Sequence, residues 1–382
     1  MIYLDNAATT KIFDSVNKKI ADINENFYFN PSALYSKAVE VKKMLESARE
    51  ELAKNMGTTG EHIIFTSGAT ESNNTALNGF LTGKKDAEYI FSSGEHPSVF
   101  AGANNLKMQN KTVLFVPLKK DSTVDIEKLK SMLTENTHYV SIMHVSNETG
   151  AINDIKEICR VVKNFNKNII VHSDGTQAFG KIDVDVTDLG VDAYTISAHK
   201  FHGPKGVGAL YVKNPEKLKP YIFGGGQQSG HRSGTENVSG YVGMSLASSI
   251  ATENLKQNFA MISALRDYVK QQISSNCSDF LFNEAQNNSP YVLSISFKGL
   301  RGEVLQRKLD ENGILIGIGS ACSSKKQNNR VLEQMGISKD FGLGSIRLSF
   351  SSFNTPEEIK KATEIIIEQY KLLKEDMSRW KM

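Results

Sequence analysis

The sequence has few cysteines, no long apolar run and little net charge. Cysteine occurs only at Cys159, Cys277 and Cys322, an odd and low number that argues against a disulfide-stabilised secreted fold. No segment approaches the roughly 18 apolar residues needed to cross a bilayer, and no basic segment followed by an apolar stretch opens the chain. The formal net charge of +3 is spread along Lys-rich segments, which argues against direct nucleic-acid binding. We therefore expect a cytoplasmic protein without a membrane span.

The arrangement of apolar residues predicts an α/β domain. From about residue 60, short β-rich runs alternate with amphipathic segments of helical spacing. We expect buried strands at 63–66, 89–91, 113–116, 139–143 and 169–171, and helices at 98–108, 125–134 and 153–165. Strands that alternate with helices of this length form a mainly parallel sheet.

The pattern changes after about residue 240, where a smaller α+β lobe is expected. A long helix at 240–275 precedes strands at 291–297 and 345–350, with helices at 302–312 and 356–376. A chain of 382 residues is also longer than a single hydrophobic core usually grows. We predict a large domain over 15–255, and a small domain formed by 1–14 and 256–382 that carries the segment around Cys322.

Two polar segments follow strands of the predicted sheet. The segment 66–74, TSGATESNN, places small residues where a strand gives way to a helix, and such a turn can bind an anion through free N–H groups. The other segment, 171–177, reads VHSDGTQ. Ligands collect at the carboxyl ends of strands in such sheets, so Asp174 is positioned to pair with a cationic group and Gln177 to donate a hydrogen bond. The alternatives are ordinary helix caps at both places.

A third segment supplies a candidate amine nucleophile. Lys200 follows a buried-looking strand beside His199, and burial or a cationic neighbour makes a lysine reactive. Lys205 is a rival in the following Gly-Pro turn, and both lysines could instead be ordinary surface residues. An anion site, a carboxylate and a lysine at three strand ends match the phosphate, the pyridinium nitrogen and the aldehyde of pyridoxal 5′-phosphate. His96 follows another strand and is positioned to lie against the cofactor ring.

The same residues allow a metal site as a competing interpretation. That site would use His96, His172, Asp174, His199 and His202, but no HExxH spacing or similar motif is present. We therefore expect no metal.

Two further residues are candidates for the reaction itself. Cys322 lies in a loop of small residues followed by lysines, an environment typical of a reactive thiolate, although an incidental exposed thiol is the alternative. Arg347, on a predicted strand of the small lobe, can clamp a substrate carboxylate if it faces the cleft between the lobes. Cys159 lies on the apolar stripe of its helix and is expected to pack in the core.

Ordered motifs along almost the whole chain resemble cysteine desulfurases of the NifS/IscS type, which belong to aminotransferase class V. The similar segments are 3–10, 30–32, 65–72, 95–96, 144–150, 174–177, 197–200, 203–206, 232–237, 319–323 and 345–347. Three positions depart from the usual family pattern: Phe29 replaces Gly, Tyr35 replaces His and Gly175 replaces Ala. None of the three removes a catalytic group.

The resemblance implies a role for each matching residue. The fold would be the pyridoxal-phosphate-dependent transferase fold, with a mainly parallel seven-stranded sheet in the large domain. Lys200, Cys322 and His96 would be catalytic, with Lys200 bound covalently to the cofactor, His96 stacked on its ring and Cys322 attacking the substrate sulfur. Further cofactor contacts would come from Ala69, Thr70, Asn147, Asp174, Gln177, Ser197 and His199, and from Thr235 of a second subunit. The substrate carboxylate would be held by Asn30, Asn147 and Arg347.

The resemblance also implies the reaction and its partners. L-cysteine would yield L-alanine and a persulfide on Cys322. A homodimer would pass that sulfur to an acceptor protein, either an iron–sulfur cluster scaffold or a tRNA-thiolation enzyme. The alternative is another class V enzyme, such as a selenocysteine lyase or an aminotransferase. Cys322 separates these possibilities, because transamination needs no thiol.

Overall fold

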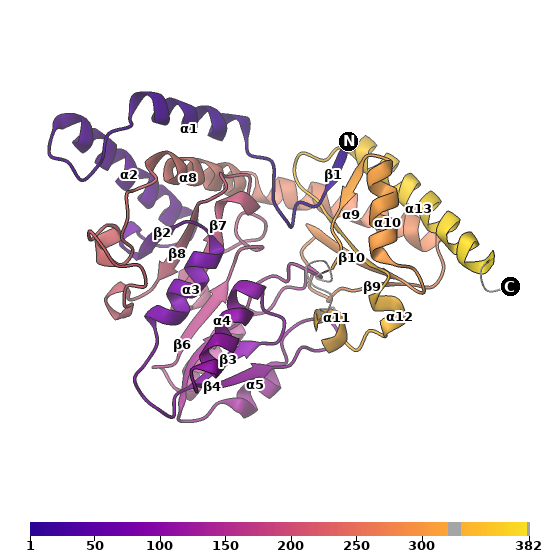
Figure 1. Cartoon of the computed structure of the whole chain (residues 1–382), viewed down its shortest axis with the longest axis horizontal. Helices are drawn as coiled ribbons and strands as arrows, with labels where there is room; N and C mark the ends of the chain where they lie inside the picture. The colour runs from indigo at the N-terminus through magenta and orange to yellow at the C-terminus, as the bar shows by residue number, and fades with distance from the viewer. Residues whose placement is uncertain (320–329, 380–382) are drawn as a thin grey trace.

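The large lobe is built on a seven-stranded sheet. The computed structural model describes residues 1–319 and 330–379. The sheet has the order β2-β8-β7-β6-β5-β3-β4, and only β8 runs antiparallel to its neighbours. The strands are β2 (Ile63–Thr66), β3 (Glu88–Ser92), β4 (Thr112–Val116), β5 (Thr137–Ser141), β6 (Ile170–Asp174), β7 (Ala193–Ser197) and β8 (Gly208–Val212). This confirms the predicted α/β fold with a mainly parallel sheet (Figure 1).

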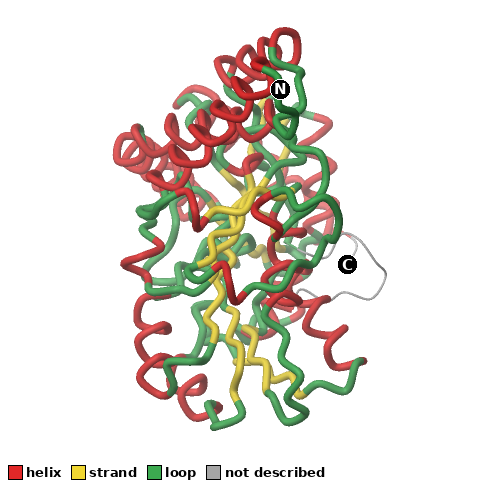
Figure 2. Tube along the Cα trace, turned by 90° about the vertical axis from the view of Figure 1, so that its left-hand side faces the viewer, coloured by secondary structure: helices red, strands yellow, loops and turns green. Residues whose placement is uncertain are grey.

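Helices cover both faces of this sheet, which explains why its central strands read as continuous apolar runs. The helices of the large lobe are α1 (Asp14–Asn26), α2 (Ser36–Asn55), α3 (Ala69–Gly79), α4 (Pro97–Met108), α5 (Ile126–Met132), α6 (Ile155–Phe165), α7 (Val186–Leu189) and α8 (Val238–Glu253). One apolar core packs α3 and α4 against one face. A larger core lies on the other face and includes side chains of α2, α6 and α8. Figure 2 shows the strands enclosed between helices.

The small lobe has a hydrophobic core of its own, formed by both ends of the chain. Its strands are β1 (Ile2–Leu4), β9 (Phe280–Phe282), β10 (Val292–Phe297), β11 (Ile314–Ile316) and β12 (Ser345–Ser349). Its helices are α9 (Leu255–Asn276), α10 (Gly302–Glu311), α12 (Lys339–Gly342) and α13 (Pro356–Arg379). The short helix α11 (Arg330–Gln334) packs instead on the large-lobe core. Because β1 pairs with β11, the N-terminal segment crosses from the small lobe to the large one.

The expected single helix over 240–275 is wrong, because two helices occupy this stretch. α8 ends and α9 begins at Asn254. The Asn254 side-chain amide donates to the Ile250 carbonyl at 2.8 Å, and such local bonds compete with a continuous helix. The turn lies where the chain passes from the large-lobe core to the small-lobe core.

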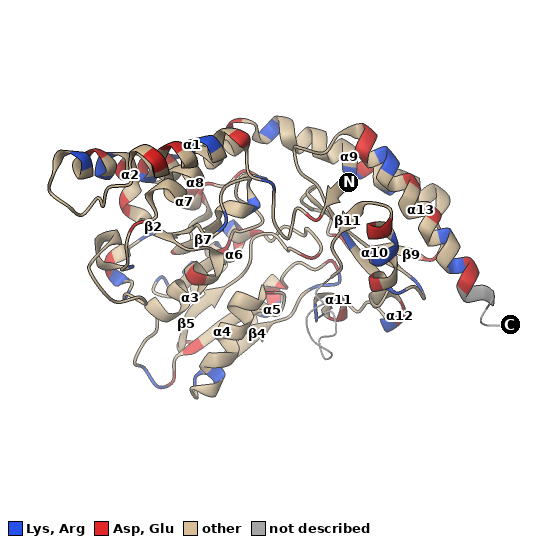
Figure 3. Ribbon diagram, turned by 45° about the horizontal axis from the view of Figure 1, so that its top comes forward, with Lys and Arg blue, Asp and Glu red and all other residues tan. Residues whose placement is uncertain are grey.

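Charges of both signs are interspersed on the outer helices. Lys and Arg alternate with Asp and Glu along α1, α2 and α13 (Figure 3). No helix within residues 1–319 and 330–379 is long and apolar enough to span a membrane.

Candidate active site

A cavity of about 600 Å³ lies at the carboxyl ends of the central strands and at the start of α3. This is where ligands bind in open α/β sheets. Ten of the predicted site residues line it: Ala69, Thr70, His96, Asn147, Asp174, Gln177, Ser197, His199, Lys200 and Arg347. Because parallel strands end at the same edge of a sheet, residues more than a hundred positions apart in sequence face one cavity.

One end of the cavity is suited to an anion. Helix α3 starts at Ala69 after Gly68, whose φ of 148° is a conformation that favours glycine, and Gly68 has no side chain to cap the helix. The first N–H groups of α3 therefore remain for a ligand, and the helix dipole favours negative charge there. His199 contacts the Thr9 hydroxyl through Nδ1 at 3.1 Å, which leaves Nε2 for a ligand. Burial, aided by nearby lysines, lowers the pKa of His199 to about 4, so its ring is neutral near pH 7.

Asp174 supplies a buried carboxylate at the end of β6. Its side chain is only 4% exposed. It accepts hydrogen bonds from the Asn73 amide at 2.8 Å and from the Thr176 backbone N–H at 3.0 Å. The residues after Asp174 form turns, so it does not cap a helix as the alternative interpretation had it. No Lys or Arg in the described part of the chain forms an ion pair with it. A cationic ligand atom would therefore complete the site.

Lys200 is the amine of this cavity. Its Nζ donates to the carbonyl oxygens of Ala7 at 2.6 Å and Ala8 at 2.7 Å. Burial lowers the pKa of Lys200 to about 8, and the positive charge of Arg347 adds to this effect. A larger fraction of the amine than in an exposed lysine is thus neutral near physiological pH, as a nucleophile must be. The rival, Lys205, also lines the cavity, but its side chain is exposed.

His96 and Gln177 present neutral polar groups to the same space. His96 caps α4, and its Nδ1 contacts the Ser98 hydroxyl at 2.8 Å and the Ser98 backbone N–H at 3.2 Å. Burial lowers the pKa of His96, so a flat, uncharged ring faces the cavity. The Gln177 amide nitrogen donates to the Ala7 carbonyl at 2.9 Å.

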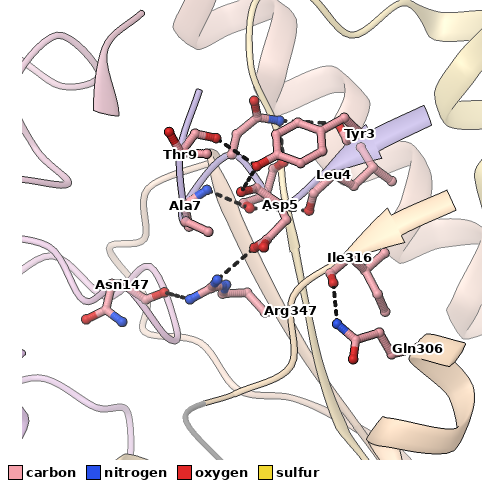
Figure 4. A network of polar contacts seen from close by, with 12 residues as sticks. Tyr3, Leu4, Asp5, Ala7, Thr9, Asn147, Gln306, Ile316 and Arg347 are labelled. Carbon is pink, nitrogen blue, oxygen red and sulfur yellow. Dashed lines mark hydrogen bonds and ion pairs between the residues drawn. The ribbon is translucent and has the colours of Figure 1, made fainter. Parts of the chain in front are cut away.

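Arg347 brings a cation from the small lobe to the cavity. It lies on β12, where Nη1 donates to the Asn147 carbonyl at 2.8 Å and Nη2 pairs with Asp5 at 2.8 Å (Figure 4). Its Nε is buried and has no hydrogen-bond partner among the described residues. Arg347 also lines the cavity, where the positive charge of its guanidinium suits a ligand carboxylate.

Two predicted residues, Asn30 and Thr235, are not brought to the cavity of this chain. Asn30 is exposed and its side-chain oxygen accepts a hydrogen bond from the Ser32 N–H at 2.9 Å. Thr235 is also exposed, and neither residue lines the cavity of this chain. Cys322 lies outside the described residues.

The histidines of the competing metal interpretation point to different partners. His172 contacts the hydroxyls of Ser141 and Thr195, whereas His202 contacts the Lys11 carbonyl. Within 1–319 and 330–379, no three His, Cys, Asp or Glu side chains gather as metal ligands.

Sequence reasoning missed a second lysine beside the site. Lys181 is 4% exposed, and its Nζ donates to the Gln177 side-chain oxygen at 2.7 Å. The only sequence signal is its position four residues after Gln177, at the end of an Ala-Phe-Gly turn.

Gly175, which follows Asp174, leaves room for a buried tyrosine. A Cβ atom at Gly175 would lie 2.0 Å from ring atoms of Tyr194, whose hydroxyl contacts His144 Nδ1 at 2.7 Å.

We expect Gly175→Ala to lower the free energy of unfolding by about 2–3 kcal/mol, as overpacking does, measured by urea unfolding. Tyr194→Leu removes the ring atoms that the new Cβ would contact. The double variant should therefore lose less free energy of unfolding than the sum of the two single losses. If the two changes in free energy of unfolding are strictly additive, the steric contact between residue 175 and Tyr194 is contradicted.

Gly83→Ala is the matched control. A Cβ at Gly83 meets no atom of the described residues within 4 Å, so the free energy of unfolding should change by less than about 0.5 kcal/mol.

The comparisons with known proteins agree with this geometry. The family model described as aminotransferase class-V matches residues 2–362. A protein named cysteine desulfurase IscS from Dictyoglomus turgidum is 35% identical over an alignment covering 100% of this chain and 98% of that protein. A protein of the same name from Clostridium botulinum is 36% identical, covering 99% and 96%. Among solved structures, a NifS-like protein superposes with a TM-score of 0.92 at 35% identity, covering 97% of this chain and 100% of that one.

Proposed function

Because this chain belongs to the class-V aminotransferase family, we propose that it is a pyridoxal-phosphate-dependent cysteine desulfurase. The observation that carries the proposal is the meeting of three groups in one cavity: the uncapped start of α3, the buried carboxylate of Asp174 and the amine of Lys200. These groups suit the phosphate, the ring nitrogen and the aldehyde of this cofactor.

The cavity residues fit the cofactor by their chemistry. The N–H groups of α3 at Ala69 and Thr70 would hold the phosphate, together with Ser197 and His199. Asp174 would pair with the ring nitrogen, Gln177 would donate to the phenolic oxygen, and His96 would lie on the ring. Lys200 would hold the aldehyde carbon covalently, and Thr235 would add a phosphate contact from a second subunit. When bound, pyridoxal phosphate supplies an electron sink for a substrate amino acid.

Lys200 has a second role as a proton carrier. Its pKa of about 8, lowered mainly by burial, lets Nζ accept a proton from the substrate Cα and return it near neutral pH. The carboxylate of Asp174 favours positive charge on its partner atom throughout, because Asp174 has no competing ion pair among the described residues.

Arg347 would bind the substrate carboxylate. Arg347 and the neighbouring Asn147 both line the cavity, and a guanidinium binds a carboxylate with defined geometry. Asn30 is proposed to contribute to the same carboxylate. A cysteine-bound structure exists for one neighbour, titled "SspA in complex with cysteine", which has a TM-score of 0.82 at 29% identity. That title supports cysteine as the amino acid bound here.

Cys322 would receive the sulfur. Its thiolate attacks the sulfur of L-cysteine, so that the Cβ–S bond breaks and an S–S bond forms on Cys322. Cβ gains a proton, and the products are L-alanine and a persulfide. No external oxidant is needed, because the oxidation of the sulfur is matched by the reduction of Cβ.

A homodimer is part of the proposal. Several large apolar side chains of the α1–α2 connection and of the loop after β8 are exposed, among them Leu34 at 96% and Phe223 at 81%. Thr235 lies outside the cavity of its own chain, so a second copy is the available source of that contact. The sulfur would pass to an acceptor protein, either an iron–sulfur scaffold or a tRNA-thiolation enzyme. We place this reaction in the cytoplasm, where the free thiols of Cys159 and Cys277 stay reduced.

Product analysis tests the proposal. The purified protein, loaded with pyridoxal phosphate and given L-cysteine with a reductant, should release alanine and sulfide in equal amounts. A keto acid without sulfide would favour an aminotransferase. Activity with selenocysteine but not with cysteine would favour a lyase of that substrate. Either of these results would overturn the desulfurase proposal.

A further inference from the structure

Lys181 is a buried lysine that has no acidic partner among the described residues. It lies in the turn that follows β6, and no ion pair to it is found in residues 1–319 and 330–379. Its Nζ donates to the Gln177 side-chain oxygen at 2.7 Å and lies 5.8 Å from the ring centroid of Tyr291. Burying an ammonium without a carboxylate is costly, so its retention here calls for a role.

The charges that face Lys181 belong to the candidate active site. Burial lowers the pKa of Lys181 to about 7, and the charges of Lys200 and Arg347 contribute to this shift. Lys181 therefore lies within electrostatic reach of both the covalent lysine and the substrate-binding arginine.

The hydrogen bond from Lys181 determines which way the Gln177 amide points. When it is protonated, the Lys181 Nζ has only donors, so it faces the amide oxygen of Gln177. The amide nitrogen is then turned to the opposite side, where it donates to the Ala7 carbonyl at 2.9 Å. That same carbonyl accepts from Lys200 at 2.6 Å. A continuous polar chain thus runs from Lys181 through Gln177 and Ala7 to Lys200.

We propose that Lys181 is a positioning residue, which holds Gln177 with its N–H donor turned toward the cofactor site and its oxygen turned away. This inference rests on the proposed function, since Gln177 is the donor assigned to the phenolic oxygen of the cofactor. Without Lys181, the Gln177 oxygen loses its partner and the amide can rotate, so that an acceptor faces the cofactor oxygen. Both the affinity for the cofactor and its electronic state would then change.

The test measures cofactor binding and visible absorbance instead of turnover. Lys181→Met keeps the length and the apolar stem of the side chain but removes its donors. We expect the dissociation constant for pyridoxal phosphate to rise roughly fivefold, as loss of one oriented hydrogen bond implies. The pH midpoint of the visible absorbance should also rise, because losing a cation and a donor favours protonation of the nitrogen that joins Lys200 to the cofactor.

A double-mutant cycle separates positioning from general stabilisation. Gln177→Leu should weaken cofactor affinity in the same direction, and adding Lys181→Met to it should cause little further loss. Lys163→Met is the control, because this lysine is also partly buried but pairs with Asp192 at the other end of the sheet. Its cofactor affinity and pH midpoint should match the wild type.

The outcomes are distinct. The inference is overturned if Lys181→Met has the wild-type affinity for pyridoxal phosphate and the wild-type pH midpoint of the visible absorbance. It is also overturned if Lys181→Met weakens cofactor binding equally in the wild-type and Gln177→Leu backgrounds. If Lys181→Met fails to fold by its thermal melt, Lys181→Arg decides, since a guanidinium is also a pure donor. Wild-type behaviour of the Arg variant supports the inference, and behaviour like Gln177→Leu overturns it. A wild-type chain that acquires no chromophore would overturn the proposed function together with this inference.

Discussion

Replacing Cys322 by Ser is expected to abolish sulfur release while leaving the cofactor in place. The serine hydroxyl is a poor nucleophile toward sulfur, so cysteine-dependent formation of alanine and sulfide should fall by at least about 10³-fold. The visible absorbance of the bound cofactor should stay unchanged, because none of the cavity groups assigned to the cofactor is altered. Sulfide and alanine assays on the cofactor-loaded variant provide the measurement.

Cys277→Ser is the matched control for this change. Burial raises the pKa of the Cys277 thiol to about 11 and also raises the pKa of Cys159, so neither is a thiolate near pH 7. Cys277→Ser should retain wild-type activity. Full activity in Cys322→Ser would contradict the assignment of Cys322 as the sulfur acceptor.

Replacing Lys200 by Ala is expected to lower turnover at least as much as Cys322→Ser does. The variant loses both the covalent attachment of the cofactor and the base at the substrate Cα, so turnover should fall on the order of 10⁴-fold. Addition of the cofactor should no longer produce the absorbance band of a lysine-bound pyridoxal phosphate. Absorbance spectra and the alanine assay together measure both losses.

Lys205→Ala distinguishes the two lysines of this segment. Lys205 lines the same cavity from an exposed position, so its loss should leave the lysine-bound absorbance intact. If Lys205→Ala loses the band and Lys200→Ala keeps it, the roles of the two residues are reversed.

The main site groups were predictable because each follows a strand of the sheet. The segment after β2, Asp174 at the end of β6 and Lys200 just after β7 are separated by many residues, yet a parallel sheet aligns these ends. The alternation of apolar strands and amphipathic helices was enough to predict that sheet. Their roles toward a cofactor remain predictions until one of the variants is measured.

Contacts made by irregular segments could not be predicted in the same way. The Ala7 and Ala8 carbonyls reach Lys200 because the N-terminal segment crosses between the lobes, and no local pattern encodes that path. Lys181 reads as an ordinary surface lysine, since only the fold of the preceding turn buries it. The break at Asn254 was missed because a single Asn within a helical pattern is only a weak signal.

The exposed positions of Asn30 and Thr235 have a different cause. Their predicted roles came from resemblance to a family, and a single chain does not bring either residue to its own cavity. A contact supplied by a second copy leaves no signature in the periodicity of one sequence.

Mapping of the cofactor attachment tests the central claim most directly. The cofactor-loaded protein is reduced with borohydride, digested and analysed by mass spectrometry for a pyridoxyl-modified lysine. The account predicts a single modified peptide with the label on Lys200. A label on Lys205, or a protein that yields no modified lysine, would contradict it.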